Sequence, residues 1–354
     1  MGQGNATKTG MTIGLDLGDR YTHVCVIDED GAVAERQRVL TRPASLRRLL
    51  SSYPPSRVVL EVGAHSPWVS RLVSELGHEA VVANPRRLAV IYANESKNDV
   101  VDAEALARVG RVDAKLLRPI QHRSAASQVD RTLLRSRAVL VRSRTALVAH
   151  VRSSVKSIGA RLPRGSTASF GRRMQGELPD ELREALAPLL ELIQELTRRI
   201  RVYERTIERR CATTHPETRQ LTQVRGVGDL TALAFVLCLE DPKRFPKSRV
   251  VGAYLGLRPR QRQSGERDPR LGITKAGDVE LRRLLVGSAH YILGPFGPDS
   301  DLRRFGLRLI ARGGPGAKQR AVVAVARKLA VLLHRLWITG EVYEPLRQAH
   351  AAAA

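Results

Sequence analysis

Short apolar runs rich in β-branched residues alternate with amphipathic stretches over the first third of the chain. Residues 11–17, 22–28 and 32–39 have the composition of strands, and an Asp-Glu-Asp-Gly segment supplies hairpin-turn chemistry between the last two. Beyond them the periodicity alternates between helix and strand, which predicts an α/β layer and a first domain over residues 11–118. The further predicted elements are helices near 43–52 and 66–76, strands at 57–62 and 79–83, a helical stretch opening at Asn84, and a helix from Asp99 to about Val112.

The middle of the chain predicts two long helices. Residues 121–164 contain ten Lys/Arg and one acid, with apolar residues at helical spacing, and predict a basic amphipathic helix. A break containing Pro and Gly ends it, and the polar stretch to Pro179 predicts a loop. A second helix at about 180–211 tolerates Pro188 near its start. Two long helices separated by a turn suggest an antiparallel coiled-coil hairpin or a dimer arm over residues 121–212, and a plain helical spacer is equally compatible.

Residues 213–340 predict a mainly helical domain with polar loops. Gly226 and Gly228 precede an apolar helix, which resembles the hairpin of a helix-hairpin-helix, whose glycines let backbone amides approach a phosphate. A simple turn is the alternative. Residues 256–267 are rich in Arg, Pro and Gly and predict an exposed loop. The predicted helices are the apolar helix at 229–239, an Arg-bearing helix around 281–285, and a final apolar helix at about 317–338.

The composition indicates a polyanionic partner. The chain carries 59 Lys and Arg against 35 Asp and Glu, a net charge of +24, and arginine, which binds phosphate in a bidentate fork, dominates. A hydrophobic content of 43% is enough for real cores and excludes a disordered basic tail. No apolar run approaches the roughly 20 residues of a membrane span, and residues 1–10 do not resemble a signal peptide, so a cytoplasmic, nucleoid-associated protein is expected. Three scattered cysteines predict buried thiols without a disulfide or zinc framework: Cys25, Cys211 and Cys238.

Four acidic residues of the first domain form a candidate metal site. Asp16 lies in an apolar run, where an unpaired charge is costly, and Glu61 ends another such run. Asp99 and Asp102 are three residues apart on a predicted helix and therefore share a face, whereas Glu104 is expected to point elsewhere. Such acids can converge into an oxygen-ligand site that holds Mg²⁺ against a nucleic-acid phosphate. The plainer alternatives are a strand-end or turn carboxylate for Asp16, an edge-strand charge for Glu61, and helix N-terminal capping for Asp99 and Asp102.

The ordered combination of motifs is similar to one family. It consists of the four acids, a long helical insert, and then Gly226-x-Gly228, Leu257-Arg258-Pro259, Ser264-Gly265, Lys275-Ala276-Gly277 and Leu281-Arg282-Arg283. This series resembles the Asp-Glu-Asp-Asp (DEDD) insertion-sequence transposases, which are relatives of the pilin-gene DNA invertases, and the resemblance covers about residues 11–340. It implies an N-terminal α/β domain of the RNase H or RuvC kind and a distinctive C-terminal transposase domain.

The resemblance also implies an activity and its partners. It implies site-specific recombination of a mobile element, Mg²⁺ at the four acids, and Ser264 as the nucleophile. Two metal ions are expected, with Mn²⁺ as an alternative. For part of the family it implies a non-coding guide RNA that pairs with donor and target DNA. Because neither half of the chain alone offers both nucleophile and metal, we expect one composite site. A homo-oligomer, a dimer or a tetramer, is expected, and the two halves of the site can come from one protomer or from different protomers.

The assignment of Ser264 as a nucleophile rests on the family resemblance. A serine hydroxyl needs its proton withdrawn and the phosphate charge neutralised, and basic neighbours serve the second need. Without the resemblance, Ser264-Gly265 is more simply a turn. The candidate phosphate clamps, which could equally form a solvated basic face, are Arg258, Arg260, Arg262 and Lys275.

The sequence departs from the family pattern at two places. Val62-Gly63-Ala64 follows Glu61 where many relatives have a small residue, a hydroxyl residue and then glycine, and Thr274 stands where a serine commonly precedes the lysine. Neither change removes a proposed catalytic group, so the departures concern the assignment to a subfamily more than the activity.

Three other classes share part of the pattern. Actin-like ATPases and sugar kinases have a similar first phosphate loop, but the chain shows no second Asp-x-Gly phosphate strand. A RuvC-like junction resolvase would hydrolyse DNA with the four acids and would not need Ser264. A DNA-packaging protein would use the arginines and would tolerate the loss of Asp16. A transposase accounts for the acids, the serine loop and the basic helices together.

Overall fold

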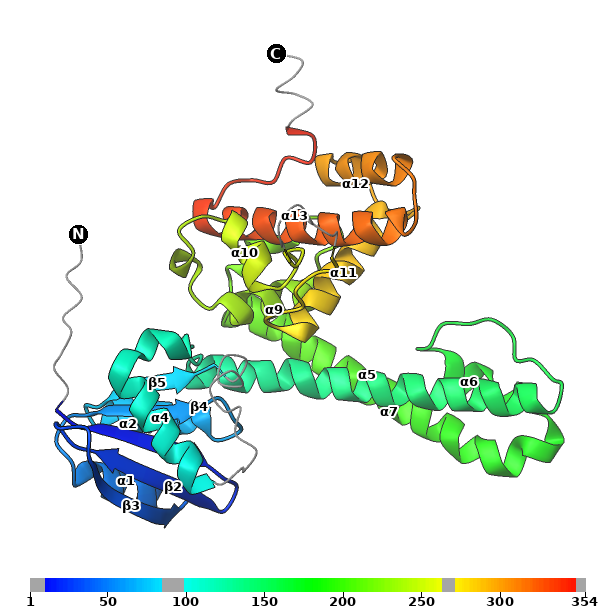
Figure 1. Ribbon diagram of the computed structural model, residues 1–354. Coiled ribbons are helices and arrows are strands. Elements are labelled where there is room, and N and C mark those ends of the chain that lie inside the picture. The colour runs from blue at the N-terminus through cyan, green and yellow to red at the C-terminus, as the bar shows by residue number, and fades with distance from the viewer. Residues whose placement is uncertain (1–9, 85–98, 263–270, 348–354) are drawn as a thin grey trace. The chain divides into compact units, whose positions relative to one another are not determined.

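The computed structural model describes residues 10–84, 99–262 and 271–347 of the chain (Figure 1). The chain forms two compact units, residues 1–124 and residues 125–354. In its described part the first unit is a sheet with helices on both faces, and the second is mostly helical. This confirms the predicted order of an α/β region followed by helices. The helical stretch predicted to open at Asn84 lies, beyond Asn84 itself, outside the described residues.

Five strands of the first unit form one mixed sheet in the order β3-β2-β1-β4-β5. β1 pairs antiparallel with β2 and parallel with β4, and β5 is parallel to β4. The Asp28 carboxylate shapes the turn between β2 and β3, because it accepts hydrogen bonds from the backbone N–H groups of Asp30 and Ala32 at 3.0 and 2.9 Å. The strands match the five predicted ones: β1 Thr12–Leu17, β2 Tyr21–Ile27, β3 Val33–Leu40, β4 Arg57–Glu61 and β5 Glu79–Ala83.

Helices cover both faces of this sheet. Those described are α1 (Pro43–Ser51), α2 (Ser66–Glu75), α4 (Asp99–Asp113) and a 3-10 helix, Ala114–Leu117. Successive side chains of a strand point to opposite faces, so Leu15 and Leu60 pack with α1 and α2 in the larger core. Cys25 and Val59 point to the opposite face and pack with residues of α4. The central strands are therefore covered by helices on both faces.

The second unit begins with two long helices, α5 (Ala125–Ser157) and α7 (Asp180–Thr213), which lie side by side as a hairpin (Figure 1). Both long helices confirm the prediction, including Pro188 inside α7. The prediction of a plain polar loop before Pro179 is wrong. That connection contains α6 (Phe170–Arg173) and a 3-10 helix, Gln175–Glu177, and both Phe170 and Met174 are fully buried against the two long helices. A few apolar residues in a polar stretch thus fill the space between the helix ends.

The remaining helices pack around one large core. α9 is apolar on all sides and lies in its centre, where Phe235 contacts Trp337 of the last helix. α9, α11 and α13 confirm the predicted helices, whereas α10 and α12 were not predicted. None of the described helices is long and apolar enough to cross a membrane. The elements are α8 (Thr218–Thr222), α9 (Asp229–Leu239), a 3-10 helix (Pro242–Arg244), α10 (Arg249–Tyr254), α11 (Val279–Leu293), α12 (Asp301–Ala311) and α13 (Ala317–Thr339).

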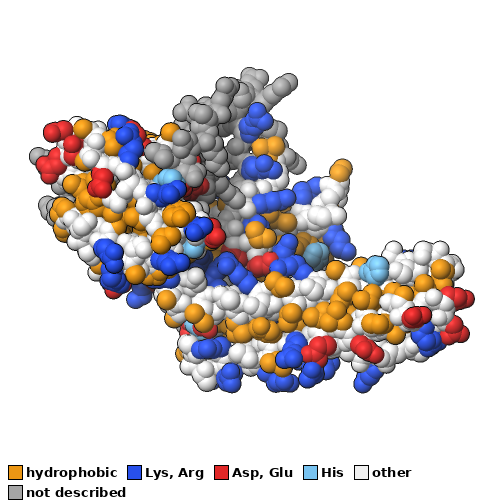
Figure 2. Space-filling model, turned by 90° about the horizontal axis from the view of Figure 1, so that it is seen from below, with side chains coloured by type: hydrophobic (Ala, Val, Ile, Leu, Met, Phe, Trp, Pro, Cys, Tyr) orange, Lys and Arg blue, Asp and Glu red, His pale blue; other side chains and the backbone are white. Residues whose placement is uncertain are grey.

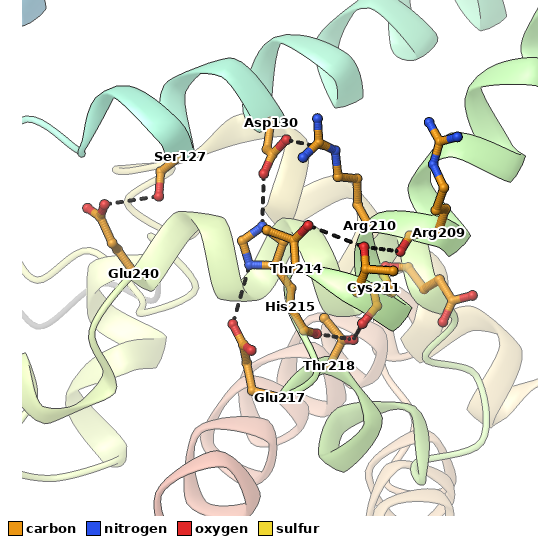
Figure 3. Close-up of polar contacts among 12 residues, drawn as sticks. Ser127, Asp130, Arg209, Arg210, Cys211, Thr214, His215, Glu217, Thr218 and Glu240 are labelled. Carbon is orange, nitrogen blue, oxygen red and sulfur yellow. Dashed lines mark hydrogen bonds and ion pairs between the residues drawn. The ribbon is translucent and has the colours of Figure 1, made fainter.

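A polar cluster fastens the start of α5 to this core (Figure 3). The Asp130 carboxylate on α5 is buried, and its oxygens lie 2.9 Å from Nε2 of His215 and 3.5 Å from Nε of Arg210. Ser127 on the same helix donates a hydrogen bond of 2.9 Å to Glu240, just after α9. A buried carboxylate needs such partners, so the base of the hairpin is held in a defined place.

We expect Phe170→Ala to destabilise the second unit, because it empties a fully buried aromatic site beneath the Arg152 guanidinium. Loss of a buried Phe costs about 3–5 kcal/mol. Denaturant unfolding measures the change, and Val139→Ala, at a side chain 49% exposed on α5, serves as the control with a change below about 0.5 kcal/mol. Equal effects of the two substitutions would show that the connection is not part of the core.

Candidate active site

Two of the predicted acids lie side by side at one edge of the sheet. Asp16 is near the end of β1 and Glu61 is the last residue of β4. The two strands are parallel, and Gly14 is in register with Val59. Asp16 lies two residues after Gly14, and Glu61 lies two residues after Val59. Side chains two residues apart on a strand point to the same face, so both acids lie next to each other on the face that carries Gly14 and Val59. That is the face covered by α4.

α4 crosses this face antiparallel to β1. A Cβ built on Gly14 would lie 2.0 Å from the carbonyl oxygen of Ala103, and one built on Gly110 would lie 2.4 Å from Val59. The C-terminal part of α4 lies at the start of the sheet, because Arg111 donates a hydrogen bond to the Gly10 carbonyl. The first turn of α4, which contains Asp99 and Asp102, therefore lies at the edge where β1 and β4 end.

Ion pairs and hydrogen bonds hold α4 in this position. Glu104 accepts a hydrogen bond of 2.6 Å from Arg36 on β3 and also pairs with Arg108. These hydrogen bonds, with Arg36 as the larger cause, lower the pKa of the Glu104 carboxyl. Arg57 on β4 donates to the Gly110 carbonyl at 2.9 Å. The Glu104 side chain thus points away from the other acids, as the sequence predicted. It holds α4 against the sheet through its ion pair with Arg36.

The acids at this edge fit a hard divalent cation by their chemistry. All four are carboxylates, the ligands that Mg²⁺ and Mn²⁺ favour over softer donors. The side chains of Asp16, Glu61 and Asp102 each already take part in a polar or electrostatic interaction, and the side chain of Asp99 lies outside the described part. Among the described residues, no three Asp, Glu, His or Cys side chains are arranged as a finished metal site. The backbone of β1, β4 and α4 therefore brings these residues to one edge of the sheet.

The loop after Glu61 contributes a feature that the sequence analysis missed. Nδ1 of His65 accepts a hydrogen bond of 3.1 Å from the Trp68 indole, which leaves the proton of a neutral ring on Nε2. Nε2 lies 3.7 Å from the Asp19 carboxylate in the turn after β1. His65 therefore connects the two loops that follow the acid-bearing strands. The sequence feature that could have indicated His65 is its position four residues after Glu61.

Ser264 lies outside the described residues, but both segments that lead to it are described. They pair as antiparallel chains: Arg260 N–H donates to the Gly272 carbonyl at 3.0 Å, and Thr274 N–H donates to the Arg258 carbonyl at 2.9 Å. Ser264 thus belongs to the connection between two paired segments. The described basic side chains predicted as clamps are exposed: Arg258, Arg260, Arg262 and Lys275.

Arg282 fixes the base of this paired segment from inside the protein. Its guanidinium is only 9% exposed and donates to the carbonyls of Leu255 and Ala276 at 3.1 and 2.7 Å. Gly256 has a φ of 69°, and a Cβ there would come within 2.3 Å of the Ala276 backbone. Arg282 is thus a structural residue, although the sequence placed it in an Arg-bearing helix beside the DNA-binding motifs.

Gly226 and Gly228 line a cavity of about 530 Å³ in front of α9. Gly226 has a φ of 96°, which glycine adopts most easily, and Gly228 caps the helix. Arg225 and Arg283 also line the cavity. Positive side chains and a helix N-terminus are compatible with a bound phosphate, and phosphate binding at these glycines stays a prediction.

Comparison with known proteins assigns the chain to a class. Residues 13–159 match the model of the DEDD family named after IS110, which is described as a transposase. Residues 218–299 match the model described as the transposase IS116/IS110/IS902 family. The chain is thus an insertion-sequence transposase, an enzyme that cuts and transfers DNA.

Similar proteins extend this match over almost the whole length. The chain is 31% identical to the transposase for insertion sequence element IS1111A of Coxiella burnetii, over 94% of the chain and 90% of that relative. It is also 31% identical to the transposase for IS1328 of Yersinia enterocolitica, over 78% of the chain and 82% of the relative. A probable family 20 transposase of Pseudomonas aeruginosa is 29% identical over 94% and 98% of the two chains. The chain belongs to the IS116/IS110/IS902 transposase family.

We expect Gly14→Ala to push α4 away from β1, because the added methyl group meets backbone that cannot move aside alone. Overpacking of this kind typically costs about 1–3 kcal/mol. Gly63→Ala is the matched control, since a Cβ at Gly63 meets nothing within 4 Å. Thermal unfolding measures both. A Gly14→Ala protein as stable as the control would contradict the close packing of α4 on β1.

Proposed function

We propose that this transposase cuts and rejoins DNA through a covalent serine–DNA intermediate. Ser264 is the nucleophile, and Asp16, Glu61, Asp99 and Asp102 hold the divalent metal. The observation that carries the proposal is the convergence of β1, β4 and the first turn of α4 at one edge of the sheet. A RuvC-like N-terminal domain, a C-terminal serine transposase domain and the relation to the pilin-gene invertases belong to the same proposal.

The chemistry follows from these residue types. The Ser264 oxygen attacks the phosphorus of the DNA backbone, a new O–P bond forms, and the bond to one deoxyribose oxygen breaks. The serine proton is withdrawn, and the released sugar oxygen takes up a proton. A divalent metal, Mg²⁺ in one or two ions, neutralises charge on the phosphate when bound at the acids. The phosphoester conserves the bond energy, so a second DNA end can be joined by the reverse attack.

The exposed arginines beside the serine supply a second source of charge. Arg258, Arg260 and Arg262 lie on the segment that leads to Ser264, and their guanidinium groups can hold phosphate oxygens in a bidentate fork. Gly226 and Gly228 offer backbone amides to a second phosphate. These contacts position the DNA and do not select its sequence, so we propose that a guide RNA provides the pairing.

We further propose a division of labour along the chain. Residues 11–118 carry the acids, residues 121–212 form a coiled-coil arm, and residues 213–340 carry the serine. The net charge of +24 supports binding of both DNA and RNA. A homo-oligomer in which one protomer supplies the acids and another the serine would complete each site.

Trapping of the protein–DNA adduct tests the nucleophile. From cells that carry the gene with its flanking DNA, we expect denatured protein to retain a phosphodiester on Ser264, mapped by mass spectrometry. The adduct should fall below detection in Ser264→Ala and in Asp16→Ala. Ser74→Ala, at an exposed serine of α2, is the control and should retain the adduct.

A different result would favour hydrolysis. If Ser264→Ala still cuts DNA with Mg²⁺ and no adduct forms in the wild type, the enzyme acts as a RuvC-like nuclease that uses the four acids alone. The serine intermediate would then be wrong.

Metal binding can be measured without any DNA. A ligand that binds only the folded state raises stability by RT ln(1 + [L]/Kd), so we expect Mg²⁺ alone to raise the unfolding temperature of the wild type in a concentration-dependent manner. Asp16→Asn and Asp102→Asn should abolish this shift. Asp30→Asn is the control, because Asp30 lies in the exposed turn at the opposite end of the sheet. An unchanged shift in Asp16→Asn would remove Asp16 from the metal site.

A further inference from the structure

The end of α11 presents two exposed aromatic rings that the recombination chemistry does not use. Tyr291, in the last turn of the helix, is 42% exposed, and Phe296, in the turn that follows, is 83% exposed. The other phenylalanines of the chain are buried or partly buried. A large apolar ring in water is unfavourable, so two such rings close together in the chain indicate a contact with a ligand.

The turn that carries the phenylalanine is rigid. Residues 294–298 read Gly-Pro-Phe-Gly-Pro, and the two prolines restrict the backbone. A Cβ built on Gly297 would lie 2.7 Å from the carbonyl oxygen of Tyr291, so the turn packs closely on the end of the helix. The Arg303 guanidinium also ties this end by donating to the Ile292 carbonyl at 2.7 Å. The turn is thus fixed against the part of α11 that carries the tyrosine.

Tyr291 also lines the cavity of about 530 Å³ in front of α9. A Cβ built on Gly226 would lie 2.8 Å from Cδ1 of the tyrosine ring, so the ring packs on glycine backbone and is held in place. One wall of the cavity is a face of α11, where Arg283, Gly287 and Tyr291 follow one another at intervals of four residues. This face therefore offers a positive charge at one end and an aromatic ring at the other.

The glycine between them is not required by packing within the chain. Gly287 lies in the middle of α11, where glycine is unfavourable. A Cβ built there would meet nothing within 4 Å. The glycine leaves the helix backbone open, so a ligand that runs from the arginine to the ring can approach the helix closely.

The charges of the cavity select an anionic ligand. Arg225 and Arg283 line it, and there is no Asp or Glu among the described residues that do so. The Arg283 side chain is 63% exposed and pairs with Glu280 at 2.9 Å, a surface pair that is weak and can be exchanged for a phosphate. Lys and Arg side chains are scattered over the face of the protein that Figure 2 shows, so charge alone does not single out a site. Arginines next to exposed rings do, because they match the phosphates and the bases of one nucleic-acid strand.

We propose that this surface binds an unpaired segment of the DNA, with bases stacked on Tyr291 and Phe296 and phosphates held by the arginines of the cavity. The inference rests on the proposed function, in which the glycines before α9 contact a second phosphate, and it names the form of DNA that lies there. Bases in a duplex are stacked on each other, so both rings can be used only by an unpaired strand. Transfer of a DNA strand separates it from its former partner, and such a segment therefore arises in the reaction of a transposase.

Quenching of 2-aminopurine in a single-stranded DNA oligonucleotide tests the stacking. All proteins carry Ser264→Ala and no Mg²⁺ is added, so no DNA is cut, and failure of the serine nucleophile would not alter the result. We expect binding to quench the fluorescence, and Tyr291→Leu with Phe296→Leu to weaken the binding about tenfold or more. Tyr291→Phe in place of Tyr291→Leu should recover most of the loss, because it keeps the ring. Val202→Ala, at an exposed side chain of α7, is the control and should bind as the parent does.

Gly287→Leu provides a second test, in which stability and binding should respond differently. Leucine has the higher helix propensity and the space beside Gly287 is open, so the unfolding temperature should not fall. The same side chain would occupy the place of the DNA strand, and the affinity for the oligonucleotide should fall about tenfold or more.

Unchanged quenching and affinity in the ring variants would overturn the proposal and leave the serine chemistry untouched. An equal loss of affinity for a duplex of the same sequence would show that the rings do not select an unpaired strand. Tighter binding of RNA than of DNA of the same sequence would assign the surface to an RNA. Each of these two results would also contradict the proposal.

Discussion

The contact between Gly14 and the backbone of α4 is the constraint on which the candidate active site depends. A helix can approach a strand this closely only where no side chain intervenes, and at Gly14 a single methyl group would meet the Ala103 carbonyl. This approach places the first turn of α4 beside the ends of β1 and β4. The acids then share one edge, although they are spread over more than 80 residues of sequence. Glu104 and Arg57 keep the helix in that place from two sides.

In the second half of the chain, a buried arginine holds the backbone near the candidate nucleophile in place. The Arg282 guanidinium satisfies carbonyl groups at the base of the paired segments that lead to Ser264. A buried guanidinium is costly unless its donors are satisfied, so these bonds fix the local backbone strongly. The exposed arginines on the same segments remain available to phosphates. One arginine thus organises the segment, and its neighbours can contact DNA.

Much of the fold could be predicted from periodicity, and the site only in part. The five strands and the long helices followed from alternating or helical spacing of apolar residues, which burial imposes locally. α12 was missed because its Arg-rich sequence hides a narrow apolar stripe, and the buried Phe170 and Met174 were missed because they are isolated in a polar stretch. The common edge of Asp16 and Glu61 depends on strand register, which no local pattern records. His65 was missed because its role depends on Asp19, which is distant in the sequence and is brought to His65 by the fold.

Affinity cleavage by Fe²⁺ in place of Mg²⁺ is the most direct measurement of the central claim. Ferrous ion bound at the acids, with ascorbate and peroxide, generates hydroxyl radicals that cut the nearby chain, and mass spectrometry locates the cuts. The account predicts cuts clustered near residues 16, 61 and 99–102 that disappear in excess Mg²⁺ and in Asp16→Asn. Cuts located elsewhere, or spread evenly along the chain, would contradict a metal site at this edge of the sheet.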